Sequence, residues 1–221
     1  FIRALAAPAD LIVTGGIDGK LRLWTPELEP RGEPFDGHKG GVLSVALSKQ
    51  GEIASFGVDQ ILRVWSSANG GKYRESVSLN LGRPGFSQQL GNLIVIDPRW
   101  GWGRQVAFAA KDDLLAVAPF DAKLRLFHKD GKPVAEMPQA HDGQQVQTVA
   151  FVAGGPRLLS AGFDKKLRFW MADGQSAAAP VEAHSAPAAG LDVSPDGALI
   201  GSTRTDDAVH LSDGAGTPAA G

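Results

Sequence analysis

The sequence predicts an all-β fold built from several copies of one small antiparallel sheet. Four stretches of the 221-residue chain repeat one pattern: an apolar run, a tight turn opened by an Asp, and a second apolar run that ends in an aromatic residue. β-Branched and aromatic residues fill both arms of the pattern, which favours two strands joined by a hairpin turn. The copies read LIVTGGIDGKLRLW from Leu11, EIASFGVDQILRVW from Glu52, LLAVAPFDAKLRLF from Leu114 and RLLSAGFDKKLRFW from Arg157.

The spacing within and between the copies is regular. Asp and aromatic residue lie six positions apart in the pairs Asp18 and Trp24, Asp59 and Trp65, Asp121 and Phe127, and Asp164 and Trp170. A fifth copy, LIGSTRTDDAVHLS, keeps Asp206 but has Ser212 at the aromatic position. Consecutive turn Asp residues lie 41, 62, 43 and 42 residues apart. A period near 42 with one oversized interval predicts a repeat architecture that forms one continuous array.

Composition narrows the function classes. With 43% hydrophobic residues the chain can bury a substantial core, and 28 Gly and 14 Pro fit many short strands and turns. The net charge of -2 gives no electrostatic reason to expect nucleic acid or an acidic membrane as a partner. The absence of Cys removes disulfides and thiolate metal sites, and no apolar run reaches the length that crosses a bilayer. We therefore expect no cofactor, no metal and a cytoplasmic location.

Each copy has the same order of elements. A first strand precedes the hairpin, in IRALAAP from Ile2, VLSVALS from Val42, RQVAFAA from Arg104, VQTVAFV from Val146 and AAGLDVS from Ala188. A polar turn rich in Gly, Pro or Asp follows it, and a looser stretch after the hairpin supplies a fourth strand. In the second copy that outer strand is expected at Tyr73 to Leu79, followed by an insertion over residues 81–103.

Sheets of four strands must stack on one another to bury two faces, and a ring of such sheets is a β-propeller. The Gly37-His38 dipeptide, the turn Asp and the terminal Trp resemble WD repeats, and the resemblance covers nearly the whole chain. It implies one domain over 1–221 with four-stranded blades near 1–37, 38–80, 104–140, 141–183 and 184–221. Five visible blades are expected to form a segment of a larger, seven-bladed ring; a closed five-bladed ring is the alternative.

WD repeats use a buried hydrogen-bond relay from Trp to Ser or Thr, to His, and to the turn Asp. The resemblance implies complete sets in the second and fourth copies, and partial sets in the first and fifth. The residues are His38, Ser55, Asp59 and Trp65; His141, Ser160, Asp164 and Trp170; Thr14, Asp18 and Trp24; and His184, Ser202 and Asp206. The third copy has Val117 and Phe127 instead. A catalytic triad or a His metal site is the rival interpretation, but one arrangement repeated in every blade favours a structural role.

Two surfaces are candidates for binding a partner protein. In WD-repeat proteins the residue before the turn Asp commonly faces a docking surface, and here those positions are mostly apolar: Ile17, Val58, Phe120, Phe163 and Thr205. The insertion carries Arg99, Trp100, Trp102 and Arg104, residue types favoured at binding hot spots. Each set also has a purely structural interpretation. The apolar residues before the turn Asp would pack under neighbouring loops, and the insertion would fold back and bury its Trp residues.

The sequence therefore predicts a non-catalytic scaffold or sensor that binds a protein partner. Residues 30–48 also resemble the WD arrays attached to bacterial signal-transduction NTPases. An enzyme with a propeller pocket, a hydrolase or a lyase, is the alternative, and it would need carboxylates or His side chains that converge in the central channel.

Overall fold

The computed structural model describes residues 2–7, 10–67, 72–82, 106–109, 113–119, 121–152, 157–182, 186–204, 209–214 and 216–217. These residues form five antiparallel sheets, which confirms the all-β propeller prediction. Sheets 1 to 4 have four strands each, and sheet 5 has three among the described residues.

The strands follow one another in chain order within every sheet. Sheet 1 contains β1 (Ile2–Ala6), β2 (Ile12–Gly16), β3 (Lys20–Trp24) and β4 (Phe35–Asp36). Sheet 2 contains β5 (Val42–Leu47), β6 (Ile53–Gly57), β7 (Ile61–Ser66) and β8 (Arg74–Asn80). Sheet 3 contains β9 (Val106–Phe108), β10 (Leu114–Val117), β11 (Leu124–His128) and β12 (Pro133–Met137). Sheet 4 contains β13 (Val146–Val152), β14 (Arg157–Gly162), β15 (Lys166–Met171) and β16 (Val181–Glu182). Sheet 5 contains β17 (Ala188–Val193), β18 (Leu199–Arg204) and β19 (Val209–Asp213).

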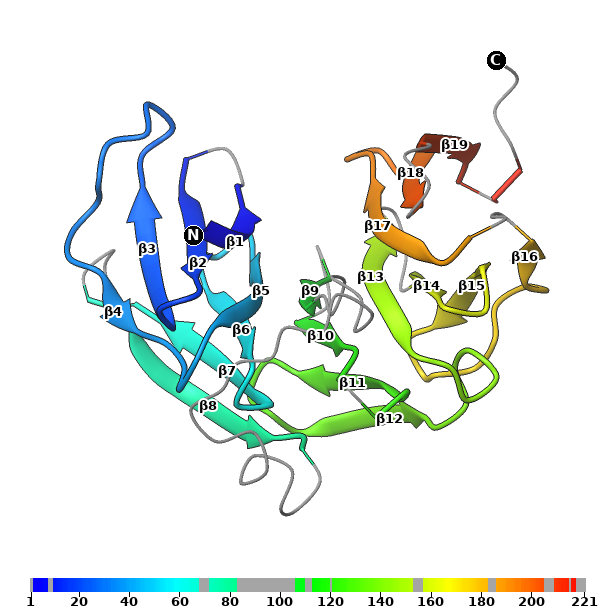
Figure 1. Ribbon diagram of the computed structural model, residues 1–221, viewed down its shortest axis with the longest axis horizontal. Helices are drawn as coiled ribbons and strands as arrows, with labels where there is room; N and C mark the ends of the chain where they lie inside the picture. Colours follow the sequence, from blue (N-terminus) through cyan, green and yellow to red (C-terminus); the bar gives the residue numbers. More distant parts are fainter. Residues whose placement is uncertain are drawn as a thin grey trace.

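The sheets are arranged around an arc, with β1, β5, β9, β13 and β17 nearest its centre (Figure 1). Neighbouring sheets contact one another through these inner strands. Every inner strand except β9 shows a register shift one residue after its start, as between Val42 and Ser44 in β5 and between Val146 and Thr148 in β13. Such bulges bend a strand and increase its twist, which suits a strand at the narrow end of a blade.

The hydrophobic core consists of four clusters, one between each pair of consecutive sheets. Phe56 of β6 is completely buried in the cluster between sheets 2 and 3, where Val106, Leu115 and Phe127 pack around it. Trp65 of β7 lies on the other face of sheet 2, in the cluster shared with sheet 1. Each sheet therefore contributes both of its faces to the core, as the stacking argument requires.

The arc is open between sheet 1 and sheet 5 (Figure 1). Val209 and Leu211 of β19 are 68% and 54% exposed, whereas Leu167 and Phe169, which hold the same register positions in sheet 4, are buried. The outer faces of the two end sheets therefore lack the cover that the inner sheets give one another. The seven-bladed ring stays a prediction.

The expected outer strand at Tyr73 to Leu79 is observed one residue later, as β8. Of the predicted insertion over 81–103, only residues 81 and 82 lie within the described part of the chain.

We predict that Phe56→Ala destabilises the protein by about 3–5 kcal/mol, because it opens a cavity between two sheets. Urea unfolding followed by tryptophan fluorescence measures this loss. Leu5→Ala is the matched control: Leu5 is 63% exposed, so its truncation leaves the unfolding midpoint within error. Equal shifts for the two variants would contradict the assignment of the core.

Candidate functional site

Sheet 4 contains a continuous chain of four buried polar side chains. Trp170 Nε1 on β15 donates to Ser160 Oγ on β14 at 2.8 Å, and Ser160 Oγ lies 2.8 Å from His141 Nε2. His141 precedes β13, and its Nδ1 lies 2.5 Å from Asp164 Oδ1 in the β14–β15 turn. The carboxylate fixes the tautomer: Nδ1–H donates to Asp164, so Nε2 accepts from the serine hydroxyl. We call this chain the Ser–His–Asp relay.

Sheet 2 repeats the relay with the same geometry. Trp65 Nε1 donates to Ser55 Oγ at 2.9 Å. His38 Nε2 lies 2.8 Å from Ser55 Oγ, and His38 Nδ1 lies 2.8 Å from Asp59 Oδ1. Arg63 Nη1 is 2.8 Å from His38 Nδ1 and 2.9 Å from Asp59 Oδ2. Because Nδ1 already donates to the carboxylate, the guanidinium donates to Asp59. Every polar atom of the relay then has a partner, which is what burial requires.

The turn carboxylates of the two relays stay ionised despite their burial. Burial alone would raise the pKa of Asp164, but hydrogen bonds from His141, the Lys166 N–H and Arg168 hold it below its ordinary value. The pKa of Asp59 is lowered in the same way, by His38 and Arg63 against the opposing effect of burial. Each carboxylate is thus stabilised as an anion by donors from its own turn, its own strand and the loop before the sheet.

An arginine four residues after each turn Asp completes the turn in four sheets. The ion pairs are Asp18–Arg22 at 2.6 Å, Asp59–Arg63 at 2.9 Å, Asp121–Arg125 at 2.6 Å and Asp164–Arg168 at 3.0 Å. In sheet 1 the hydrogen bond from Arg22 lowers the pKa of Asp18 to about 2. From the sequence these arginines were interpreted as solvated or edge-protecting residues of the strand, and their pairing with the turn Asp was missed, although the constant Asp-x-x-x-Arg spacing is visible in the sequence.

A glycine two residues before the turn Asp makes room for the histidine ring. A Cβ atom on Gly57 would lie 2.3 Å from His38 Nδ1, and one on Gly162 would lie 2.6 Å from the His141 ring. No side chain fits at such distances, so both positions require glycine. The signal in the sequence was the recurrence of Gly16, Gly57 and Gly162 at this position.

The other sheets hold only parts of the relay. In sheet 1, Trp24 Nε1 donates to Thr14 Oγ1 at 2.9 Å. In sheet 3 both partners are apolar, and Val117 and Phe127 are buried. In sheet 5, Ser202 Oγ is buried without a hydrogen-bond partner among the described residues. The two remaining predicted members, His184 and Asp206, lie outside the described residues.

The Ser–His–Asp geometry resembles a hydrolase triad, but the serines cannot meet a substrate in this structure. Ser55 and Ser160 have 0% exposed surface, and each hydroxyl oxygen already accepts a hydrogen bond from a tryptophan. A nucleophilic serine needs an open pocket beside an oxyanion hole. The buried chain instead connects the loop before each sheet to its turn and to two of its strands.

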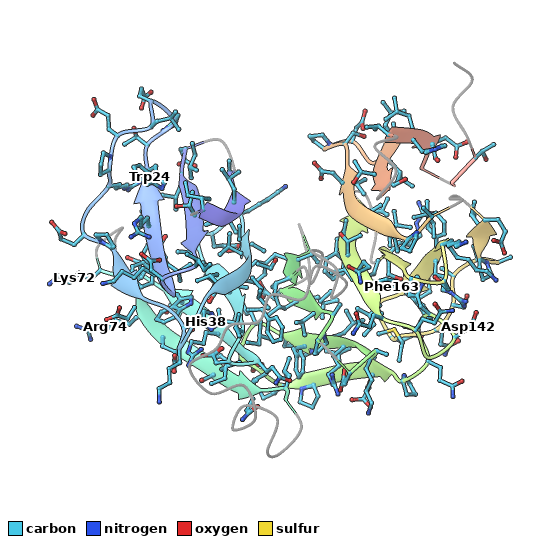
Figure 2. All side chains as sticks on the ribbon, viewed as in Figure 1. Trp24, His38, Lys72, Arg74, Asp142 and Phe163 are labelled. Atoms are coloured by element: carbon cyan, nitrogen blue, oxygen red, sulfur yellow. The ribbon has the colours of Figure 1, made fainter. Side chains whose placement is uncertain are left out.

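Part of the predicted docking surface lies on one face of the arc, formed by the β2–β3, β6–β7, β10–β11 and β14–β15 turns; we call it the Asp-turn face. Ile17, Val58 and Phe163 are each half-buried there. The backbone N–H groups of Val58 and Phe163 donate to Gly41 O and Gln145 O, which ties the turns to the loops beside them. Phe163, in the β14–β15 turn, is labelled in Figure 2. The other predicted partner residues lie outside the described residues: Phe120, Thr205, Arg99, Trp100, Trp102 and Arg104.

The centre of the arc holds a small cavity of about 250 Å³, lined by the inner strands of all five sheets. Its only ionisable lining residue is Asp192, so the described residues supply no converging set of carboxylates or histidines there. Within the described ranges, no group of three or more His, Asp or Glu side chains is placed to hold a metal ion. A search of the described residues for helices that could cross a membrane finds none.

We predict that Ser160→Ala destabilises the protein by about 1–3 kcal/mol, because it leaves Trp170 Nε1 and His141 Nε2 buried without a partner. Ser202→Ala, at the same register position in sheet 5, removes a buried hydroxyl with no partner among the described residues, so it strands no donor or acceptor there and should destabilise the protein less than Ser160→Ala does. Thermal and urea unfolding of both variants measures the contrast. Equal effects of the two changes would refute the relay as a stabilising element.

The turn carboxylates predict a loss of stability in acid. The pKa of Asp164 is lower in the folded chain than in the unfolded one, so its contribution is complete above about pH 4 and is lost as the pH falls through the folded value. Asp164→Asn removes that contribution at every pH. The gap in unfolding free energy between wild type and variant should therefore shrink below pH 4, by at most about 1.4 kcal/mol per pH unit. A gap that stays constant from pH 7 to pH 2 would disprove this assignment.

Comparison with known proteins identifies the repeat. The family model described as "WD domain, G-beta repeat" matches residues 29–66 and 131–171, and these ranges contain the hairpins of the two complete relays. A search of the curated proteins finds no match to this chain. Each matched range contains the outer strand of one sheet and the three inner strands of the next, β4 to β7 and β12 to β15. The two matched repeats and the five stacked sheets together support a WD-repeat β-propeller.

Proposed function

We propose that the protein is a non-catalytic platform that binds a partner protein through its Asp-turn face. WD propellers generally bind proteins, and the observation that carries the proposal here is the recurrence of apolar side chains directly before the turn Asp. Ile17, Val58 and Phe163 keep part of their surface exposed on one face of three sheets. Apolar surface that recurs on one face favours a docking site over chance exposure.

The relays support this use of the face. Val58 precedes Asp59 and Phe163 precedes Asp164, so each candidate contact residue adjoins a carboxylate fixed by several hydrogen bonds. A side chain that is already held in place loses little conformational freedom when a partner covers it, which improves affinity. The same networks bury the Ser hydroxyls, which supports a binding function rather than hydrolysis.

A narrower role as a sensor in bacterial signal transduction is part of the proposal. Its support is the resemblance of residues 30–48 to propellers attached to signalling NTPases.

We predict that the double variant Val58→Asp/Phe163→Asp retains about ten-fold less of the partner protein than wild type, because two carboxylates would be buried in an apolar contact. The measurement is quantitative mass spectrometry of the proteins that the immobilised 221-residue chain retains from cell extract. Val134→Asp is the matched control, since Val134 is 36% exposed on the outer strand β12. Retention of the same proteins by wild type and the double variant, with unchanged melting temperatures, would overturn the proposal.

A further inference from the structure

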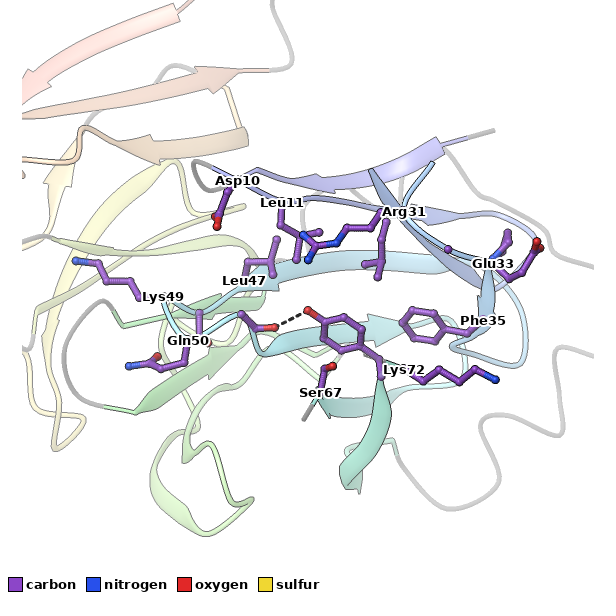
Figure 3. Close-up of a pocket in the computed structure, with 16 residues that line it drawn as sticks. Asp10, Leu11, Arg31, Glu33, Phe35, Leu47, Lys49, Gln50, Ser67 and Lys72 are labelled. Carbon is purple, nitrogen blue, oxygen red and sulfur yellow. Dashed lines mark hydrogen bonds between the residues drawn. The ribbon is translucent and has the colours of Figure 1, made fainter. Parts of the chain in front are cut away.

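A cleft of about 820 Å³ lies between sheets 1 and 2, at the strand ends opposite the Asp turns (Figure 3). Its lining comes from described residues of the β1–β2 and β3–β4 connections of sheet 1 and of the β5–β6 and β7–β8 connections of sheet 2. Binding sites for ligands typically have volumes of about 300–1,000 Å³ and mostly apolar walls. We call it the interblade cleft; its principal lining residues are Leu11, Arg31, Phe35, Lys49, Lys72 and Tyr73.

The apolar wall of the interblade cleft is held in place by contacts between the two sheets. Phe35 of β4 stacks on Tyr73 of sheet 2 with ring centroids 6.0 Å apart and an interplanar angle of 3°. Its other contact is edge-on with Trp65, at 5.3 Å and 64°. The Tyr73 hydroxyl donates to Gly51 O at 2.8 Å, drawn as a dashed line in Figure 3. The aromatic surface is therefore formed before any ligand arrives, which lowers the entropic cost of binding.

The cleft also contains three cations that form no ion pair among the described residues. Arg31, Lys49 and Lys72 form no ion pair with a described carboxylate, whereas the arginines of all four Asp turns are paired. Lys49 and Lys72 lie at opposite ends with Arg31 between them (Figure 3). Burial raises the pKa of Tyr73, and the positive charge of Arg31 opposes that rise. The Arg31 charge is therefore close enough to interact electrostatically with the Tyr73 side chain. The lining also includes two carboxylates, Asp10 and Glu33, and all five charged side chains are exposed, so the three cations outnumber the anions by one.

One rim of the cleft offers free backbone groups. Arg31 N donates to Leu23 O at 2.8 Å, and the strand pairing of sheet 1 resumes at Phe35. Between these points the backbone of residues 32–34 forms no hydrogen bond with the described chain. Pro34 has no N–H, so the rim offers the N–H groups of Gly32 and Glu33 and three carbonyl groups, which can pair with the backbone of a peptide bound beside them.

We propose that the interblade cleft binds an extended acidic peptide segment of a partner protein. An aromatic or aliphatic side chain of the peptide packs on Phe35 and Tyr73. Its carboxylates meet Arg31, Lys49 and Lys72, and its backbone runs along residues 32–34. The inference rests on the proposed role in protein binding but uses a different face of the arc, so variants can separate the two sites.

The sequence supplies a site-specific reporter for this cleft. Tyr73 is the only tyrosine in the chain, so protein labelled with 3-fluorotyrosine gives one ¹⁹F resonance. A displayed library of random decapeptides is selected on the full chain, and each selected peptide is synthesised and titrated against the labelled protein. We expect the selected peptides to be enriched in Asp and Glu around an aromatic or aliphatic residue, and to shift the Tyr73 resonance on binding. A selection that yields no peptide reporting at Tyr73, or one without acidic enrichment, overturns the proposal.

Charge variants complete the test. Arg31→Gln should weaken the selected peptides about ten-fold, because it removes a charge-assisted contact from an exposed side chain. Arg74→Gln is the matched control, since Arg74 is an exposed cation of β8 that does not line the cleft. Equal affinity for Arg31→Gln and wild type would refute the site. Val58→Asp/Phe163→Asp should leave peptide affinity unchanged, so failure of the Asp-turn face and failure of the cleft give different results.

Discussion

A buried carboxylate in the turn of a β-hairpin is stable only when several hydrogen-bond donors surround it. In the two sheets with a full relay, these donors connect the segments of the sheet to one another. Asp164 receives hydrogen bonds from His141, from the Lys166 N–H and from Arg168. These donors belong to the loop before the sheet, the turn itself and the strand after it. Moving the three segments apart would leave the buried carboxylate without donors, and an uncompensated buried charge has a high free energy. The serine and tryptophan extend the same constraint into the core between sheets.

Most of the fold could be predicted from the sequence, because the hairpin pattern around each turn Asp is local and recurs along the chain. Alternating apolar residues on either side of an Asp turn predict the hairpin, and the period near 42 predicts the stacked sheets. The relay members of sheets 2 and 4 were expected from the resemblance to WD repeats. Ser and Trp keep a fixed spacing to the turn Asp, whereas the His lies 21 residues before it in sheet 2 and 23 in sheet 4. Arg63 and Gly57 were not recognised, because an arginine on a strand resembles a solvated residue and a glycine before a turn resembles a turn residue. Only coordinates show that the first pairs with Asp59 and that the second leaves space for His38.

The interblade cleft could not be anticipated in the same way. Its aromatic wall joins Phe35, from the end of one repeat, to Tyr73, from the β7–β8 connection of the next. Neither residue belongs to the pattern that the copies share, so periodicity gives no information about either. Surfaces specific to one protein arise at positions where one repeat differs in sequence from the others, while the positions that all repeats share maintain the scaffold.

The open arc has a thermodynamic consequence. In a stack of repeats, the stability of each unit is approximately the sum of its own contribution and those of its interfaces with neighbours. Sheets 2, 3 and 4 each have two interfaces, whereas sheet 5 has one, with Val209 and Leu211 facing solvent. Amide protection should therefore decline from the middle of the arc towards its ends. Any molecule that covers the β19 face would order the last blade as it binds, so occupancy of that face and rigidity of the blade rise together.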